Sequence, residues 1–406
     1  MTVILGGDTM PLGWIDFSKD ERNKVLNVIH LLDEPGAVDE LGIGAIRDSF
    51  ADYFFPGTST VQTRAKYFLI VPYVLMEAGS GKYGSDLNDI LHWIDKEERK
   101  CRDILIKTST DGVIGSLVPK AWVLRTPSNI YWNGIKRIGI FKEDLSIKEY
   151  VHQSIIQRSL KQAKAYGNRN KEAEENERDD MDAGDITSIQ FWNLGDTYKS
   201  DWRDNLTIEL LPEEAAFLKS QIITTQRNSL FAYILKNNID LDKYGSFGAL
   251  SEDIRDSVDN DLRDRMRLAN DFNNLVSIIT TRYNLIVFAG KNDRARENWE
   301  LLSKDLKRRS EVDLEAIFKK LTIRNPKLKT FLRRVKDAVR AGDIAVVDDL
   351  IKKREISLKG MQRAKTNRIG EYTNQNWIGL DKLDYRYAPA KRILRDIMNA
   401  EVARDV

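Results

Sequence analysis

The sequence predicts a mainly α-helical, multi-helical protein built from two or three packed domains with aromatic, loop-rich layers. Apolar residues recur at spacings of three and four through most of the chain, as they do on the buried face of a helix. Alternating apolar and polar runs, which predict strands, are few. With 406 residues, of which 42% are hydrophobic and 31% charged, the chain is long enough for more than one hydrophobic core.

In the N-terminal third, start and stop signals delimit four helices. Ser18 and Glu21 form a capping box at the start of the first helix. A Pro-Gly pair closes the second helix, and Pro72 is expected to kink or stop the third. The four helices are predicted over about 18–34, 43–54, 59–72 and 85–107.

The rest of the chain is also predicted to be helical. Pro, Gly and Asn interrupt the aromatic runs of 113–140, which predicts a packed, loop-rich layer with short helices. Pro212 followed by two glutamates is typical of a helix N-terminus. Further helices are expected over 144–165, 253–287, 299–321, 328–341 and 346–353.

Composition divides the chain into four parts. The stretch 166–184 has almost no apolar residues and a dense acidic run. Such a stretch is typical of a flexible charged linker or loop, and an exposed charged helix is the alternative. The predicted parts are an N-terminal helical domain (1–165), this linker (166–184), a middle helical domain (185–290) and a basic C-terminal helical domain (291–406).

Several enzyme classes leave no signature in this sequence. Gly79-Ser80-Gly81-Lys82 lacks the first glycine and the Ser or Thr of a phosphate-binding loop. The three histidines are far apart, and the single cysteine, Cys101, excludes multi-cysteine metal sites. No nucleophile motif of an acyl-transfer enzyme is present. We therefore expect no metal and no cofactor, apart from one carboxylate-based alternative.

Neither a membrane span nor a signal peptide is predicted. No run of eighteen apolar residues occurs, and the first residues, MTVILGGDTMPLGW, lack the basic start of a signal peptide. We therefore expect a cytoplasmic protein.

The carboxylate-based alternative lies in the segment 38–73, where charged, glycine and aromatic residues are dense. Asp48 and Asp52 are four residues apart, so a helix places both carboxylates on one face. With Asp39, Glu40 and Lys66 they could hold Mg²⁺ and cleave a phosphodiester, as a metal-dependent nuclease does.

The other interpretation of this segment is a structural charge network, which the sequence favours because charged groups beside core residues usually pair. If the pair of Arg47 and Asp48 is buried, replacing either residue by alanine is expected to cost roughly 3–5 kcal/mol. The network would join Arg47, Asp48, Asp52, Arg64 and Lys66.

Charge is distributed unevenly along the chain. Residues 291–406 contain 29 Lys and Arg against 18 Asp and Glu, a net charge of +11, whereas residues 1–290 have a net charge of −9. Either the C-terminal part binds an anionic partner, or the two parts neutralise each other across an internal interface.

A basic helix face predicts DNA binding. In the helix over 328–341, cations recur three or four residues apart, while Leu332, Val335 and Val339 can face the core. Such a stripe could follow a phosphate backbone, and a solvated helix face is the alternative. The predicted nucleic-acid contacts, which we call the basic face, are Lys307, Arg308, Lys329, Arg333, Lys336 and Arg340.

Several tryptophans lie beside glycine, asparagine or aspartate rather than in helical stripes. Trp132 and Trp192 could form a shelf on which bases stack. The favoured interpretation is that they anchor irregular segments to the core, because an indole combines an apolar body with a polar tip.

The chain resembles an uncharacterised bacterial family, domain of unknown function 6361. The resemblance extends from about Gly13 to Ile397, with Tyr73 where tryptophan is more usual. It implies no known activity, but family members lie in bacterial defence islands beside helicases and phospholipase-D-like nucleases. The segments that carry it are GWIDFS (13–18), DELGIGAIRDSFADYFFPGTSTVQTRAKYFLIVPY (39–73), PSNIYWNGI (127–135), FWNLGDTYKSDW (191–202) and LDYRYAPAKRILRDI (383–397).

Together these observations give a hypothesis for function. The chain is expected to be a non-catalytic subunit of an anti-phage defence system that binds DNA, a partner helicase–nuclease of the same operon, or both. The alternatives are a metal-dependent nuclease that uses the acidic cluster, and a pure protein scaffold without affinity for nucleic acid.

Overall fold

The protein is mainly α-helical, as predicted. The part of the chain that the structure describes contains α-helices, loops and short 3-10 turns but no strand. One isolated β-bridge joins Phe141 and Trp192. No helix in this part combines the length and the apolarity that a bilayer crossing requires. The computed structural model describes residues 39–81, 84, 86–117, 122–169, 191–369, 371–372 and 376–402, so the helix predicted over 18–34 lies outside the described residues.

The N-terminal helices pack around α3, which contacts α4, α5 and α6. Nearly all side chains of α3 are buried, and Pro72 lies inside this helix without ending it. The side chain of Asp86 caps α4 by accepting the Asn88 N–H at 2.8 Å. These helices are α2 (Gly44–Phe54), α3 (Tyr67–Ser80), α4 (Leu87–Leu105), α5 (Pro127–Arg137) and α6 (Ile147–Arg169).

The turn before α3 explains why this helix begins later than predicted. The hydroxyl of Thr58 donates to the carbonyl of Phe55 at 2.6 Å. The side-chain amide of Gln62 accepts the Ser59 N–H and donates to the Gly57 carbonyl, both at 3.1 Å. The Tyr131 hydroxyl then accepts the N–H groups of Thr63 and Arg64, at 2.8 and 3.0 Å. A helix from Ser59 would use both of these N–H groups, and α3 therefore starts at Tyr67.

In the middle of the molecule, α17 packs against α8 and α9. Pro212 is the first residue of α8, as predicted. The single helix predicted over 253–287 is instead two helices, because Asp259 accepts the N–H groups of Asp261 and Leu262 and thereby starts a new helix. These helices are α8 (Pro212–Thr225), α9 (Leu230–Asn237), α10 (Phe247–Ile254), α11 (Asn260–Val287) and α17 (Tyr387–Val402).

A further group of helices packs along α11. The helix predicted over 299–321 is broken, because Asp313 accepts the Ala316 N–H at 2.9 Å and caps a separate helix. Gly342, with a φ of +74°, ends α15 in the left-handed conformation, and α16 follows directly. The helices are α12 (Asp293–Leu302), α13 (Leu306–Arg309), α14 (Leu314–Lys320), α15 (Pro326–Ala341) and α16 (Ile344–Lys359).

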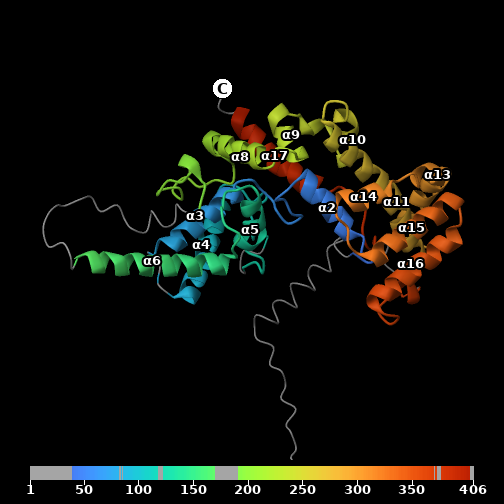
Figure 1. The fold of residues 1–406 in the computed structure, drawn as a ribbon, viewed down its shortest axis with the longest axis horizontal. Helices are drawn as coiled ribbons and strands as arrows, with labels where there is room; N and C mark the ends of the chain where they lie inside the picture. Colours follow the sequence, from blue (N-terminus) through green and yellow to red (C-terminus); the bar gives the residue numbers. More distant parts are fainter. Residues whose placement is uncertain are drawn as a thin grey trace, which may run out of the picture.

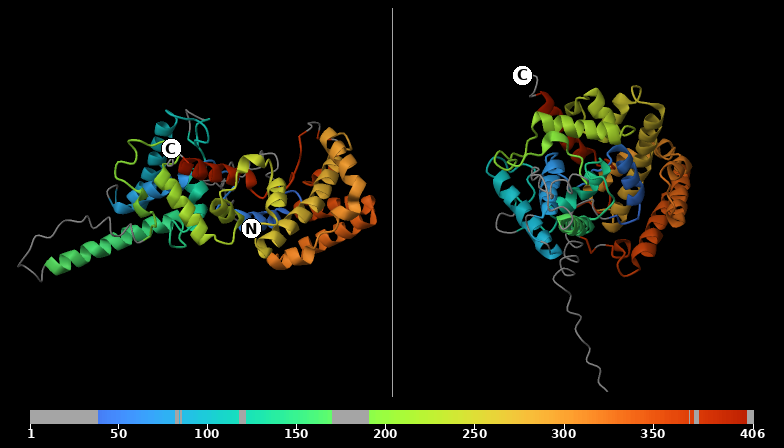
Figure 2. Two further views of the ribbon diagram at one scale, coloured as in Figure 1. Left: turned by 90° about the horizontal axis from the view of Figure 1, so that it is seen from above. Right: turned by 60° about the vertical axis from the view of Figure 1, so that its left-hand side comes forward.

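The molecule is elongated (Figure 1). Helices α3 to α6 lie at one end, α11 to α16 lie at the other, and α8, α9 and α17 lie between them. Helix α6 projects from the first end (Figure 2) and continues to Arg169, four residues into the predicted linker; residues 170–184 lie outside the described residues. Although α17 belongs to the predicted C-terminal part, it packs on the middle helices α8 and α9.

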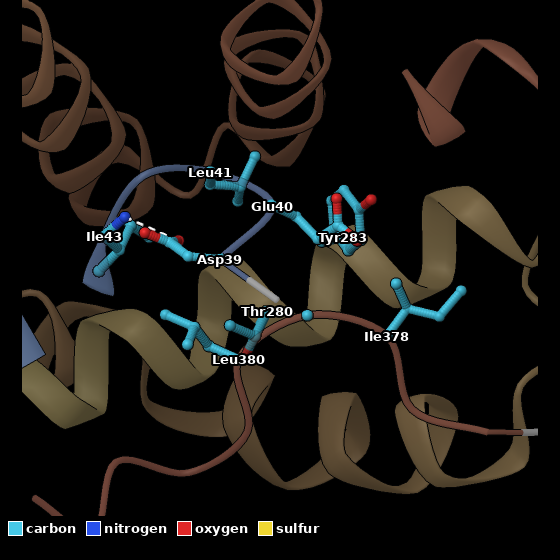
Figure 3. A pocket seen from close by; sticks show the side chains of 9 residues that line it. Asp39, Glu40, Leu41, Ile43, Thr280, Tyr283, Ile378 and Leu380 are labelled. Atoms are coloured by element: carbon cyan, nitrogen blue, oxygen red, sulfur yellow. Dashed lines mark hydrogen bonds between the residues drawn. The ribbon is translucent and has the colours of Figure 1, made fainter. Parts of the chain in front are cut away.

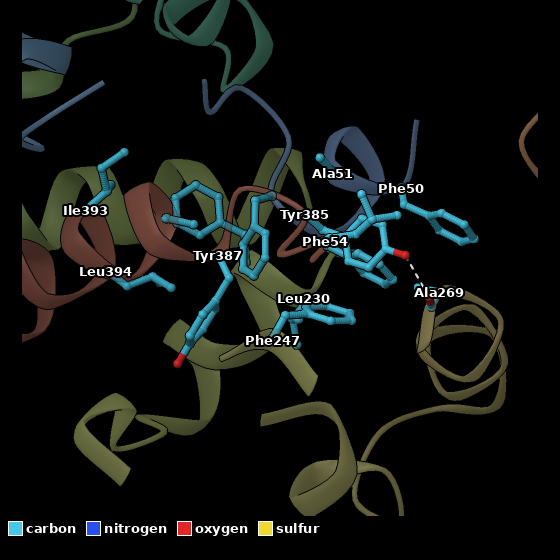
Figure 4. Close-up of a cluster of buried hydrophobic side chains, with 14 of the residues drawn as sticks. Phe50, Ala51, Phe54, Leu230, Phe247, Ala269, Tyr385, Tyr387, Ile393 and Leu394 are labelled. Carbon is cyan, nitrogen blue, oxygen red and sulfur yellow. Dashed lines mark hydrogen bonds between the residues drawn. The ribbon is translucent and has the colours of Figure 1, made fainter. Parts of the chain in front are cut away.

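An aromatic cluster joins α2, α10 and the chain before α17 (Figure 4). The rings of Phe54 and Phe247 lie 4.8 Å apart, and the ring of Tyr385 lies 5.4 Å from that of Phe50. The hydroxyl of Tyr385 donates to the carbonyl of Ala269 on α11 at 2.6 Å. Segments far apart in sequence therefore share one core at this point.

Candidate functional site

The acidic residues proposed as a metal site do not converge on one point. Both carboxylate oxygens of Asp39 accept backbone N–H groups, from Ile43 at 2.9 Å and Gly44 at 2.7 Å, and so hold the start of α2. Glu40 is only 2% exposed and forms ion pairs with Lys359 and, at 2.8 Å, with Lys365. These two carboxylates are thus engaged by groups of this chain.

Asp48 and Asp52 do share one face of α2, as the spacing predicts. Arg386, which precedes α17, forms an ion pair with Asp52 and lies 3.6 Å from Asp48. Asp48 also pairs with Arg47 at 3.0 Å, but the two side chains are 45% and 27% exposed. The pair is therefore not buried, and the large cost expected for its removal does not follow.

Arg64 and Lys66 pair with acids far along the chain rather than with Asp48 or Asp52. Arg64 lies 3.0 Å from Asp396 on α17. Lys66 lies 2.6 Å from Glu214 on α8, and both side chains are nearly inaccessible to solvent. The predicted charge network exists at Arg47 and Asp48, but the pairing proposed for Arg64 and Lys66 is wrong. Across the described residues, no group of three or more His, Cys, Asp or Glu side chains could hold a metal ion.

A small cavity beside Glu40 is lined by residues from the start of the described chain, α11 and the loop at 378–380 (Figure 3). Its volume is about 10 Å³, roughly that of one water molecule. Nearby, Glu355 is fully buried and accepts hydrogen bonds from the Tyr283 hydroxyl at 2.8 Å and from the Thr366 N–H at 3.0 Å. The residues around this cavity form a buried structural network, and the cavity itself is too small for a ligand.

The two tryptophans considered as a stacking shelf belong to the core. Trp132 is 7% exposed, and its indole N–H donates to the Leu145 carbonyl at 3.0 Å. Trp192 is 3% exposed, and its indole N–H donates to the Tyr150 hydroxyl at 3.0 Å. The favoured core location is confirmed for both residues, but only Trp192 lies in an irregular segment; Trp132 belongs to α5 and anchors the loop at Leu145.

A larger cavity, of about 530 Å³, opens between α4, α5 and the start of α6. Glu98 lines it, is 2% exposed, and accepts the Ser128 N–H at 2.6 Å. Burial raises the pKa of Glu98 to about 8, because an ionised carboxylate loses its hydration there. No described cation forms an ion pair with it. The sequence did not single out Glu98, since only its packing distinguishes it from the other acids of α4.

The basic face lies on α13 and α15, with the apolar side of α15 turned inward. Leu332, Val335 and Val339 are buried, as predicted. Arg333 pairs with Glu315 on α14 at 2.7 Å, and Arg308 lies 3.3 Å from Asp305. Within the part of the chain that the structure describes, the other four cations of the face form no ion pair, namely Lys307, Lys329, Lys336 and Arg340.

A second basic feature is the groove between α15 and α16, which run side by side at one end of the molecule (Figure 1). Its volume is about 360 Å³. Four cations line it and no acid does; they are Lys327, Arg334, Lys353 and Arg354. This groove was not predicted from the sequence. Two features of the sequence could have indicated it. Lys327 and Arg334 are seven residues apart on one helix, and the next helix contains the adjacent pair Lys353 and Arg354.

Comparison with known proteins gives a family match for part of the chain and no activity. Residues 10–165 match the model of a family of unknown function (DUF6361). The match therefore covers the helices up to α6, and it includes neither the basic face nor the α15–α16 groove. No curated protein and no solved structure matches the chain.

Proposed function

We propose that the chain is a non-catalytic, cytoplasmic subunit of a bacterial anti-phage defence system and binds DNA through its basic face. The family resemblance supports the defence setting and, with it, a helicase and a phospholipase-D-like nuclease as protein partners. The observation that carries DNA binding is the set of unpaired cations on α13 and α15. They are Lys307, Lys329, Lys336 and Arg340, which form no ion pair within the described residues.

The position of the basic face argues against internal neutralisation. Opposite charges from the two parts of the chain do meet elsewhere, for example where Arg386 contacts Asp52 and where Lys365 contacts Glu40. The main described neighbours of α15 are α13, α14 and α16, all from residues 291–406, so the acidic part of the chain supplies none of its main contacts. Cations that remain exposed on one helix face can contact successive phosphates of a nucleic-acid backbone.

The test is the salt dependence of DNA binding. We expect fluorescence anisotropy of a labelled duplex to show sequence-independent binding, with a log–log salt slope of about −0.9 per phosphate neutralised. Lys336→Glu with Arg340→Glu should weaken binding and flatten the slope by about 1.8, the amount expected for two lost phosphate contacts. These two residues are preferred to Arg333 because their replacement breaks no ion pair.

The matched control is Lys236→Glu with Lys243→Glu, which makes the same change in net charge at exposed lysines of α9 and of the 3-10 turn after it. It should leave the slope unchanged. Equal loss in both variants would reduce the effect to overall charge and contradict a defined interface. A lower Tm in Lys336→Glu/Arg340→Glu with unchanged DNA affinity would support internal docking instead, and no binding by the wild type would leave the scaffold alternative.

A further inference from the structure

We infer that the α15–α16 groove is a binding site for a phosphate group, with Arg354 at its base and Lys327, Arg334 and Lys353 around it. The groove lies on a different side of α15 from the basic face. The inference therefore stands independently of the proposed function. The shared chemistry is a phosphate, whether it belongs to a nucleotide or to a nucleic-acid end.

Arg354 carries this inference because it is a buried cation without an acidic partner. The residue is 7% exposed, and its only hydrogen bond in the described structure is from Nε to the Leu41 carbonyl, at 2.9 Å. Its guanidinium carbon lies 5.6 Å from the centre of the Phe331 ring. No Asp or Glu of the described residues lies within ion-pair distance of it.

A charge in this position is costly, because it has lost much of its hydration without gaining an ion-pair partner. Burial lowers the pKa of Arg354, and the Asp39 carboxylate, which lies beyond ion-pair distance, offsets only part of this effect. A guanidinium nevertheless stays protonated in proteins, so it cannot remove the cost by releasing its proton. An anion bound in the groove would supply the missing counter-charge.

The chain holds Arg354 in place from its other side. Gly42 adopts a φ of +69°, and a Cβ at this position would lie 2.8 Å from the Nη2 atom of Arg354. Only glycine therefore permits both this backbone conformation and the close approach of the guanidinium. With Nε held by Leu41, the two terminal amino groups remain without an acceptor and are suited to a pair of phosphate oxygens.

The other lining residues favour the same ligand. Lys327 and Arg334 lie two turns apart on α15, are exposed, and form no ion pair in the described structure. Lys353 pairs with Asp349 at 2.7 Å, but both side chains are more than half exposed, so this contact is weak. Phe331 and Leu350 supply buried apolar surface between the cations. A groove of about 360 Å³ is within the size range of small-ligand sites.

The experiment uses inorganic phosphate as the ligand and the whole chain as the protein. Isothermal titration in a chloride buffer of constant ionic strength should show saturable binding to the wild type. Lys327→Gln with Arg334→Gln should raise Kd at least tenfold, the effect of about one lost charge-assisted bond. This pair is the primary variant because both residues are exposed and their replacement leaves the core intact.

Arg354→Lys keeps the positive charge but removes the fork of donors, and it should also weaken binding. If this variant fails to fold, the Kd of Lys327→Gln/Arg334→Gln alone tests the inference. Lys236→Gln with Lys243→Gln is the control of equal charge change. Absence of saturable binding, or equal loss in the control, would overturn the inference. Lys336→Glu/Arg340→Glu should retain phosphate binding, because these residues lie outside the groove. The result for this inference is therefore separate from the result for the DNA-binding proposal.

Competition identifies the source of the phosphate. A nucleoside monophosphate and an oligonucleotide with a 5′-phosphate are each titrated against bound inorganic phosphate, with the unphosphorylated oligonucleotide as reference. Displacement by the nucleotide assigns a free ligand, and displacement that requires the 5′-phosphate assigns a nucleic-acid end. If neither displaces inorganic phosphate, the groove is not a site for a biological phosphate ester and the inference fails.

Discussion

The segment 39–66 and the helices α15 and α16 both carry dense charge, but their charges are neutralised differently. In the first region, Lys66 pairs with Glu214, Arg64 with Asp396 and Asp52 with Arg386. In the second, many cations have no acidic partner in the described structure, among them Lys336 and Arg334. Charge density alone therefore does not separate a structural network from a binding surface, whereas the presence of partners from distant parts of the chain does.

Glu98 and Arg354 make the same comparison between single buried groups. Neither forms an ion pair with a described residue, yet the consequences differ. Burial raises the pKa of Glu98 to about 8, so this carboxyl can become neutral by binding a proton near neutral pH. Arg354 has no such route, because a guanidinium keeps its proton. An unpaired buried acid can therefore be stable without a ligand, and an unpaired buried arginine favours binding an anion.

The largest expected effect comes from breaking the most buried pair of the first region. Lys66→Met leaves the Glu214 carboxylate in a site where its side chain is only 6% exposed. Removing one partner of a buried ion pair costs roughly 3–5 kcal/mol, since the remaining charge is unpaired. Urea denaturation of the wild type and the variant measures this difference in the free energy of unfolding.

The control for this prediction is the double variant Lys66→Met with Glu214→Gln. Glutamine can still accept the Leu211 N–H, which Glu214 accepts at 2.8 Å at the start of α8. The double variant should therefore regain most of the lost stability. If Lys66→Met alone costs less than about 1 kcal/mol, the pair is not the structural contact that its burial indicates.

Much of the helical fold was predictable because helix signals are local. The core face of α15 and the proline at the start of α8 follow from residues within a few positions of each other. The breaks before α11 and α14 were missed because Asp259 and Asp313 act as caps inside otherwise continuous apolar patterns. A cap and an exposed aspartate look alike in such a pattern.

The candidate sites were less predictable because they depend on long-range packing. The partners of Arg64 and Lys66 lie 332 and 148 residues away, and no spacing rule reaches that far. The cations of the α15–α16 groove are visible in the sequence. That Arg354 is buried, however, depends on Phe331 of another helix and on the close approach of Gly42.

The second prediction sharpens the contrast between Glu98 and Arg354 through pH. The pKa of Glu98 is raised from 4.5 to about 8 in the folded state, so the folded protein binds one more proton than the unfolded chain between these values. This contribution is complete below pH 4.5 and is lost as the pH rises to about 8. The wild type should therefore lose up to roughly 5 kcal/mol over this range relative to Glu98→Gln.

The measurement is the free energy of unfolding of both proteins at several pH values. Glutamine keeps an oxygen that can accept the Ser128 N–H, and other titrating groups cancel in the difference between the two proteins. Parallel stability curves for wild type and Glu98→Gln would contradict the raised pKa. They would also mean that an unrecognised cation pairs with the ionised carboxylate, or that water reaches and hydrates it.

The smallest expected effect concerns the exposed pair of the first region. Asp48→Ala removes a carboxylate that is 45% exposed and contacts Arg47, itself 27% exposed. Pairs with this exposure contribute about 1 kcal/mol or less, because water already solvates both charges. Arg386 also loses a neighbour at 3.6 Å but keeps Asp52 and the Thr58 carbonyl as partners. Thermal and urea denaturation should therefore place Asp48→Ala within about 1 kcal/mol of the wild type. A loss of 3 kcal/mol or more would restore the buried network that the sequence predicted for Arg47 and Asp48.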